Sequence, residues 1–378
     1  MNIGFLQPYS ILAVDVTTLL KQFAKDGHKV VFITLTPKGD VHKVLENDNI
    51  IFETLDLDPS TRVKKLLLKA KDIINICKKH DLDILYNNFS MTQMIGLLSS
   101  PFIKTKMIYL RHHSTDAAKE FGVWKDPIID KAMNKLSAKT IVPSERVRND
   151  IIAEGGRPED VIVVPYCYDF NSYPQIDQQE VAQIRERFAG KKLFLMISRY
   201  VPEKRYELAV QLAARLRSAG YNDFAFLCLG DGFLEDDIRK LVTENNLEEH
   251  FFLEGFKENV ITYIAACDLL VHTSASEASC HAIKEAGWMR KNVICCENVG
   301  DFSDYLVDEQ NAFLVEKDFP VEPMFEKIRR FLDGEIVEKD RIAEVTPNPQ
   351  QYIIHWRLSL EVPAVLEYER KIARGRQQ

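Results

Sequence analysis

The sequence predicts two Rossmann-like α/β domains, each a doubly wound parallel sheet with helices on both faces. Short apolar runs such as KVVFITL at 29–35 alternate with longer amphipathic stretches along most of the chain. Several runs are apolar at nearly every position, which is expected of parallel strands that are covered on both faces. The length of 378 residues also exceeds what one ordinary hydrophobic core supports, so two domains are expected.

The individual elements follow from this alternation. In the first half of the chain, strands are expected at 2–6, 29–35, 83–88, 106–111, 138–142 and 161–164. In the second half they are expected at 192–197, 224–229, 250–253, 268–272, 292–296 and 312–315. Amphipathic stretches at 63–79, 204–218, 234–245 and 279–290 are typical of the intervening helices.

A polar and aromatic stretch ending in Pro174 interrupts the series, and a charged helix at about 178–189 follows it. We therefore expect a first domain over residues 1–175 and a second over residues 176–345. Residues 346–378 read as a helical tail that packs back on the first domain. Open α/β sheets bind ligands outside the carboxyl ends of their strands, so functional residues are expected there.

Composition excludes several classes of protein. The net charge of −7 argues against a nucleic-acid partner. Seven cysteines without a CxxC pair indicate reduced core thiols, as expected of a cytoplasmic protein. No run approaches the roughly 20 apolar residues that a membrane span needs. Met1 leads directly into a strand-like run with no signal-peptide pattern, so we expect a cytoplasmic protein.

The strongest candidate site is SASEASCHAIKEAG at 274–287, which follows an apolar strand. Glu277 would lie in the loop after that strand and Glu285 in the next helix. A carboxylate there can accept hydrogen bonds from neighbouring sugar hydroxyls. Taken alone, two glutamates eight residues apart are also compatible with a solvated helix face.

Three further elements favour a ligand site. Arg199 follows a strand and Lys204 precedes the next helix, which is a pairing of cations that suits a diphosphate. Gly230 and Gly232 end another strand, and glycine lets a backbone approach a ligand closely. Gly255 ends a third strand.

In this order and spacing the elements resemble the retaining GT-B glycosyltransferases of family 4, also described as glycosyl transferases group 1. The resemblance implies the GT-B fold, with an acceptor domain followed by a donor domain. It also implies transfer of a sugar from a UDP- or GDP-linked donor, without a metal or other cofactor. The matching positions are Ser198-Arg199 with Lys204, Gly230-Asp231-Gly232, Leu253-Glu254-Gly255, and Cys267-Asp268 through Ser274, Glu277 and Glu285.

The resemblance also implies roles. Arg199 and Lys204 would neutralise the diphosphate, Glu277 would hold hydroxyls of the transferred sugar, and Glu285 would bind the ribose. The remaining donor-binding positions in this domain would be Ser198, Gly230, Gly232, Gly255, Phe256, Ala278, Ser279 and Cys280. The stretch Glu277–Cys280 replaces the family's E-G-F-G, so the identity of the sugar does not transfer.

RHHSTD at 111–116 follows a strand, where family members often carry a histidine that reaches the donor sugar. His113 is the preferred candidate for this catalytic contact and His112 the second, while the alternative is a strand-end histidine bonded to backbone. We expect no metal site. His112, His113, His272 and His281 share no known zinc-ligand spacing.

Two acidic pairs imitate a DxD metal motif. Asp56 and Asp58 read as a helix start, and Asp81 and Asp83 as turn residues before a strand.

The acceptor is left open as a glycan, a lipid-linked sugar or a small molecule. The lysine-rich helix at 62–79 could hold the enzyme peripherally at the inner face of the membrane, although a solvated face over a packed stripe is favoured. The alternatives to a transferase are a GT-B epimerase or phosphorylase, and a sugar-nucleotide-binding protein that has lost catalysis. No strand is followed by GxGxxG, which excludes a nicotinamide dehydrogenase.

Overall fold

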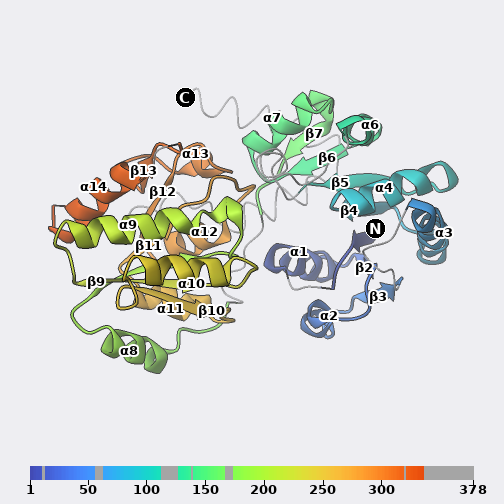
Figure 1. The fold of residues 1–378 in the computed structure, drawn as a ribbon. Coiled ribbons are helices and arrows are strands. Elements are labelled where there is room, and N and C mark those ends of the chain that lie inside the picture. Colours follow the sequence, from blue (N-terminus) through green and yellow to red (C-terminus); the bar gives the residue numbers. More distant parts are fainter. Residues whose placement is uncertain are drawn as a thin grey trace, which may run out of the picture. The chain divides into compact units, whose positions relative to one another are not determined.

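The computed structural model describes residues 1–10, 13–55, 63–111, 127–137, 139–166, 173–318 and 321–335. These residues form two compact units, unit 1 within residues 1–166 and unit 2 within residues 173–335. In each unit a parallel sheet is flanked by helices (Figure 1). The expected helical tail at 346–378 lies outside the described residues.

Unit 1 contains a seven-stranded parallel sheet in the order β3-β2-β1-β4-β5-β6-β7. Its strands are β1 Asn2–Gln7, β2 Lys29–Thr34, β3 Ile51–Thr54, β4 Ile84–Asn88, β5 Lys106–Leu110, β6 Lys139–Val142 and β7 Val161–Val163. Its α-helices are α1 Val14–Lys25, α2 Asp40–Leu45, α3 Val63–His80, α4 Ser90–Ser99, α6 Pro127–Leu136 and α7 Glu145–Ala153, with short 3₁₀ turns at Ser100–Phe102 and Pro158–Asp160.

Unit 2 contains a six-stranded parallel sheet in the order β10-β9-β8-β11-β12-β13. Its strands are β8 Lys192–Ile197, β9 Phe224–Leu229, β10 Phe251–Gly255, β11 Leu269–His272, β12 Asn292–Cys296 and β13 Phe313–Val315. Its helices are α8 Gln178–Arg187, the 3₁₀ turn η4 Pro202–Lys204, α9 Tyr206–Ser218, α10 Glu235–Glu244, α11 Val260–Ala266, α12 His281–Trp288, α13 Phe302–Tyr305 and α14 Val321–Leu332.

Both sheets have doubly wound Rossmann topology. In unit 2 the chain runs outward from β8 through β9 to β10, then returns to β11 on the other side of β8. The strand order therefore reverses between β8 and β11, which pair with each other. Ligands of open α/β sheets bind at such a reversal, outside the carboxyl ends of the strands.

The core of unit 1 has one hydrophobic cluster on each face of the sheet. Ile3 and Phe5 of β1 pack with Phe23 of α1 in one cluster. Leu6 of the same strand packs with Ile73 of α3 in the other. Successive residues of a strand point to opposite faces, so a strand that is apolar at every position fills both clusters.

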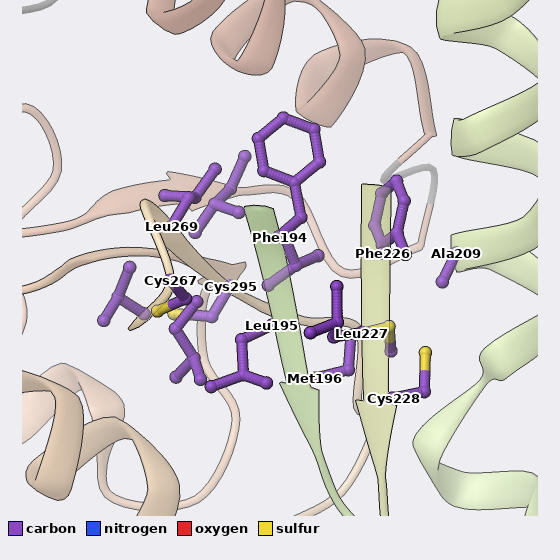
Figure 2. Close-up of a cluster of buried hydrophobic side chains, with 14 of the residues drawn as sticks. Phe194, Leu195, Met196, Ala209, Phe226, Leu227, Cys228, Cys267, Leu269 and Cys295 are labelled. Carbon is purple, nitrogen blue, oxygen red and sulfur yellow. The ribbon is translucent and has the colours of Figure 1, made fainter. Parts of the chain in front are cut away.

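The core of unit 2 is centred on β8 and β9 (Figure 2). Phe194 and Phe226 project from these neighbouring strands and meet edge to face, with ring centroids 5.2 Å apart. Leu195 and Leu227, one residue further along each strand, belong to the same buried cluster. Both strands lead from this core to the loops at their carboxyl ends.

The sequence reading missed one strand, β3 at Ile51–Thr54. It is a short edge strand whose residues are partly exposed. It therefore lacks the continuous apolar run by which the other strands of unit 1 are recognised.

Two other expectations concern turns and thiols. Asp81 lies in a turn before β4 with φ of 51°, as predicted, while Asp56 and Asp58 lie outside the described residues. Six cysteines are free and buried in the described part of the chain, as predicted. Among the helices that the structure describes, none combines the length and the apolar character needed to cross a membrane.

We predict that Phe194→Ala lowers the free energy of unfolding of unit 2 by about 3–5 kcal/mol, because it leaves a cavity in a fully buried cluster. Urea unfolding followed by fluorescence measures this loss. Phe233→Ala is the matched control, since Phe233 is 74% exposed and its removal is expected to be nearly neutral. Equal losses in both variants would contradict this description of the core.

Candidate functional site

The candidate site is formed by two loops of unit 2 that leave the sheet on either side of the strand reversal. Residues 198–205 follow β8, and residues 273–280 follow β11. The Thr273 hydroxyl donates to the Lys204 carbonyl at 2.7 Å, and the Ala275 N–H donates to the Glu203 carbonyl at 2.9 Å. Backbone contacts thus bring Lys204 beside the loop that carries Glu277.

Arg205 anchors the first loop to the sheet. It adopts a left-handed conformation, with φ of 51° and ψ of 51°, which is unfavourable for a non-glycine residue. Its guanidinium group donates to the Thr273 carbonyl at 2.7 Å, the Lys317 carbonyl at 2.9 Å and the Cys296 sulfur at 3.1 Å. Thr273 follows β11, Lys317 follows β13 and Cys296 ends β12. The Arg205 side chain therefore connects the Lys204 loop to the ends of three strands.

Glu277 is the centre of a buried polar cluster. Its Oε1 atom accepts from Lys204 Nζ, from His272 Nε2 at 3.0 Å and from Ser274 Oγ at 3.0 Å. The Glu277 and Lys204 side chains are only 13% and 11% exposed. Glu277 and Lys204, which were predicted as site residues, are therefore brought together.

The electrostatics of the cluster favour its charged form. Burial raises the pKa of Glu277, but Lys204 and His272 pull that pKa well below its usual range. Burial lowers the pKa of His272, but Cys280, whose Sγ lies 3.3 Å from Nε2, and Glu277 together raise it to about 9. These contacts favour the ionised form of Glu277 and the protonated form of His272.

One group in the cluster has the chemistry of a metal site. The ligand atoms of His272, Glu277 and Cys280 all lie within 4.8 Å of one another. Imidazole, carboxylate and thiolate are the ligands that zinc prefers. However, the Lys204 ammonium group already binds the Glu277 carboxylate, so a metal would have to displace it.

Two glycines bring the loops after β8 and β9 together. A Cβ atom on Gly230 would lie 2.0 Å from the Ser198 carbonyl oxygen, and one on Gly232 would lie 2.4 Å from the Tyr200 carbonyl oxygen. Both glycines have positive φ, at 141° and 153°. In the described part of the chain, these glycines let the loop after β9 pack closely against the loop after β8. This packing role is separate from the predicted approach of the backbone to a ligand.

The other predicted donor residues of unit 2 follow strands β8 and β10 of the same sheet. Arg199 is 70% exposed and pairs with Glu203 at 3.6 Å rather than with the buried group. The Ser198 hydroxyl bonds Tyr206 Oη at 3.0 Å. Phe256 is exposed directly after Gly255, at the end of β10.

Glu285 lies on α12, and its Oε1 accepts from Tyr173 Oη at 3.0 Å. Burial raises the pKa of this carboxyl group, although His281 and Tyr173 oppose the rise. Tyr173 therefore contacts the carboxylate that is predicted to bind the ribose, and no sequence pattern pointed to Tyr173.

Residues 278–280, which directly follow Glu277, are buried. Ala278 and Cys280 pack inward, and the Ser279 hydroxyl donates to Asp301 Oδ2 at 2.7 Å. The predicted His112 and His113 lie outside the described residues.

The sequence reading missed Arg205 and the role of His272 beside Glu277. The sequence features that could have pointed to them are that Arg205 directly follows Lys204 and that His272 ends strand β11.

Comparisons with known proteins agree with this arrangement. Residues 177–346 match the family described as Glycosyl transferases group 1, and residues 12–171 match Glycosyltransferase Family 4. An uncharacterized glycosyltransferase of Methanocaldococcus jannaschii is 30% identical over 304 residues, covering 79% of this chain and 80% of that protein. The chain is a family 4 glycosyltransferase.

Other similar proteins extend the comparison. The N-acetylgalactosamine-N,N'-diacetylbacillosaminyl-diphospho-undecaprenol 4-alpha-N-acetylgalactosaminyltransferase of Campylobacter jejuni is 23% identical over 338 residues, covering 83% of this chain and 88% of that protein. The crystal structure of Anabaena HepE, in complex with UDP and glucose, superposes with a TM-score of 0.79 at 18% identity, over 96% of this chain and 99% of that one. The glycosyltransferase thus has the GT-B fold.

We predict that the protonated His272 stabilises unit 2 in a pH-dependent manner. Its pKa of about 9 in the folded chain lies above the ordinary value of 6.5, so its contribution is full below pH 6.5 and is lost as the pH rises toward 9. The melting temperature of the wild type should therefore fall more steeply between pH 6.5 and 9.5 than that of His272→Gln. Parallel melting curves for the two proteins would show that His272 is not protonated in the fold.

Proposed function

We propose that this glycosyltransferase transfers a sugar from a nucleoside diphosphate donor, with retention of anomeric configuration and without a metal. The buried Lys204–Glu277 pair at the strand reversal of unit 2 carries the proposal. It places a fixed cation beside a carboxylate that is held ionised, where an α/β sheet binds its ligand. The cation can neutralise a diphosphate, and the carboxylate can accept hydrogen bonds from sugar hydroxyls.

Lys204 would neutralise the diphosphate as it leaves, and Arg199 would assist. Lys204 is positioned by the loop contacts described above, whereas Arg199 is exposed and can reach a ligand from solvent. Electrostatic stabilisation of a leaving group by preorganised charge is commonly the largest catalytic contribution. Two cations at the diphosphate remove the need for a metal.

Glu277 would hold hydroxyls of the transferred sugar. Three donors converge on its Oε1 atom, which fixes the direction of the carboxylate. Glu285 would bind the ribose hydroxyls, with Tyr173 orienting its carboxyl group. The exposed ring of Phe256 would lie beside the base. HepE, which shares the fold, has been crystallised with UDP, and this supports UDP as the first nucleotide to test.

In the proposed reaction, the bond between the anomeric carbon and the diphosphate oxygen breaks, and a bond to the acceptor oxygen forms on the same face. The acceptor proton passes to the departing diphosphate. Retention and this proton transfer are proposed from the family resemblance.

A lipid-linked acceptor is the first class to test, because the Campylobacter relative is named for a diphospho-undecaprenol substrate. The lysine-rich helix α3, Val63–His80, would then contact an anionic membrane surface from the cytoplasmic side.

We predict that one nucleoside diphosphate raises the melting temperature of the wild type in EDTA, and that Lys204→Ala loses most of this effect. A ligand at 100 times its dissociation constant adds about 2.7 kcal/mol of stability. Loss of a charge-assisted hydrogen bond should weaken binding roughly 10- to 100-fold. A thermal-shift panel of UDP, GDP, ADP and CMP measures this.

Lys240→Ala is the matched control, because Lys240 is an exposed lysine of the same unit that pairs with Glu244 on its own helix, at 3.8 Å. The control should respond as the wild type does. A shift that requires added metal would contradict metal independence. Absence of any shift would favour a chain that has lost donor binding.

We also predict that an α-linked sugar nucleotide gives an α-linked product. Proton NMR of the purified product reads the anomeric configuration directly. A β-linked product would overturn retention and leave the donor site as proposed.

A further inference from the structure

A second buried ion pair lies next to residues 277–280, the stretch in which Glu277 is proposed to hold the transferred sugar. Lys284 on α12 contacts Asp301, in the loop after β12, and both side chains are only 4% exposed. Lys284 Nζ also donates to Ser279 Oγ, which in turn donates to Asp301 Oδ2 at 2.7 Å. Three polar groups from separate parts of the chain thus form one closed network.

The remaining polar atoms of this network also have partners. Tyr305 Oη donates to the second carboxylate oxygen of Asp301 at 3.4 Å, and Lys284 Nζ lies 5.3 Å from the centre of the Tyr305 ring. Burying two charges is costly, and a well-packed apolar pair is often as stable. Stability alone therefore gives no reason for charges at this place.

The network fixes the stretch between Glu277 and α12. Ser279 is held by Asp301, while the adjacent Gly300 lies against Glu277. A Cβ atom on Gly300 would approach Glu277 Cβ to 2.8 Å, and Gly300 has φ of 55°. Two consecutive residues after β12 thus hold two points of the four-residue stretch 277–280.

We propose that Lys284 and Asp301 are positioning residues that hold residues 277–280 in the conformation that recognises the transferred sugar. The inference rests on the proposed function of Glu277. Neither side chain touches the donor. Asp301 acts through Ser279, and Lys284 holds the Asp301 carboxylate in place. The network therefore sets affinity for the sugar portion of the donor and leaves affinity for the nucleotide unchanged.

The test compares binding of UDP-glucose and UDP, with GDP-mannose and GDP as a second pair, by calorimetry on folded protein. The readout is the ratio of the two affinities within a pair. Ser279→Ala keeps the ion pair but removes the link to the loop. It should lower the affinity for the sugar nucleotide relative to that for the nucleotide by about 3- to 10-fold, as expected for loss of one hydrogen bond.

Two further variants separate positioning from stability. Lys284→Met leaves the buried Asp301 carboxylate without its cation. Both the melting temperature and the affinity for the sugar nucleotide relative to the nucleotide should therefore fall. Lys284→Met/Asp301→Asn removes both charges but keeps an acceptor for Ser279. It should recover much of the melting temperature and restore the ratio.

Asp268→Asn is the matched control, because it disturbs another ion pair of unit 2, in which Asp268 is 12% exposed and Arg185 lies 2.9 Å away. It should lower the melting temperature and leave the ratio unchanged. If Ser279→Ala and Lys284→Met both keep the affinity ratio of the wild type, the positioning role is wrong and the proposed function stands. A wild type that binds neither nucleotide nor sugar nucleotide would overturn the proposed function itself.

Discussion

The ion pair between Lys204 and Glu277 is the interaction on which the arrangement of the donor unit depends. Each group lies at the carboxyl end of a strand next to the strand reversal, and each is largely removed from water. Removing one charge would leave the other uncompensated, so the two loops that carry them must be built as one structure. The hydrogen bonds of Thr273 and Ala275 to the Lys204 loop, and of Arg205 to three strand ends, meet this requirement.

The same constraint accounts for the unfavourable features of the site. Arg205 takes a left-handed conformation that suits glycine, and its three hydrogen bonds offset the strain. His272 is buried, and the contacts of its Nε2 atom with Glu277 and Cys280 raise its pKa to about 9. Local strain and buried charge are typical of sites where a ligand is recognised by preorganised groups.

Much of the fold could be predicted from the sequence, because buried parallel strands are apolar at every position and helices between them are amphipathic. Among the strands that the structure describes, only the exposed edge strand β3 was missed. Lys204 and Glu277 could be chosen because their spacing from strand ends is local. Arg205, Asp301 and Tyr173 could not, since their roles depend on partners between 17 and 112 residues away in sequence. Such contacts follow from packing of the sheet and leave no local pattern.

A crystal structure of the chain soaked with UDP, in the absence of metal, tests the central claim most directly. The account predicts a diphosphate oxygen at about 3 Å from Lys204 Nζ, which is hydrogen-bonding distance, with the ribose hydroxyls on Glu285. UDP bound elsewhere, with the Lys204–Glu277 pair untouched and Glu285 still hydrogen-bonded to Tyr173, would contradict it.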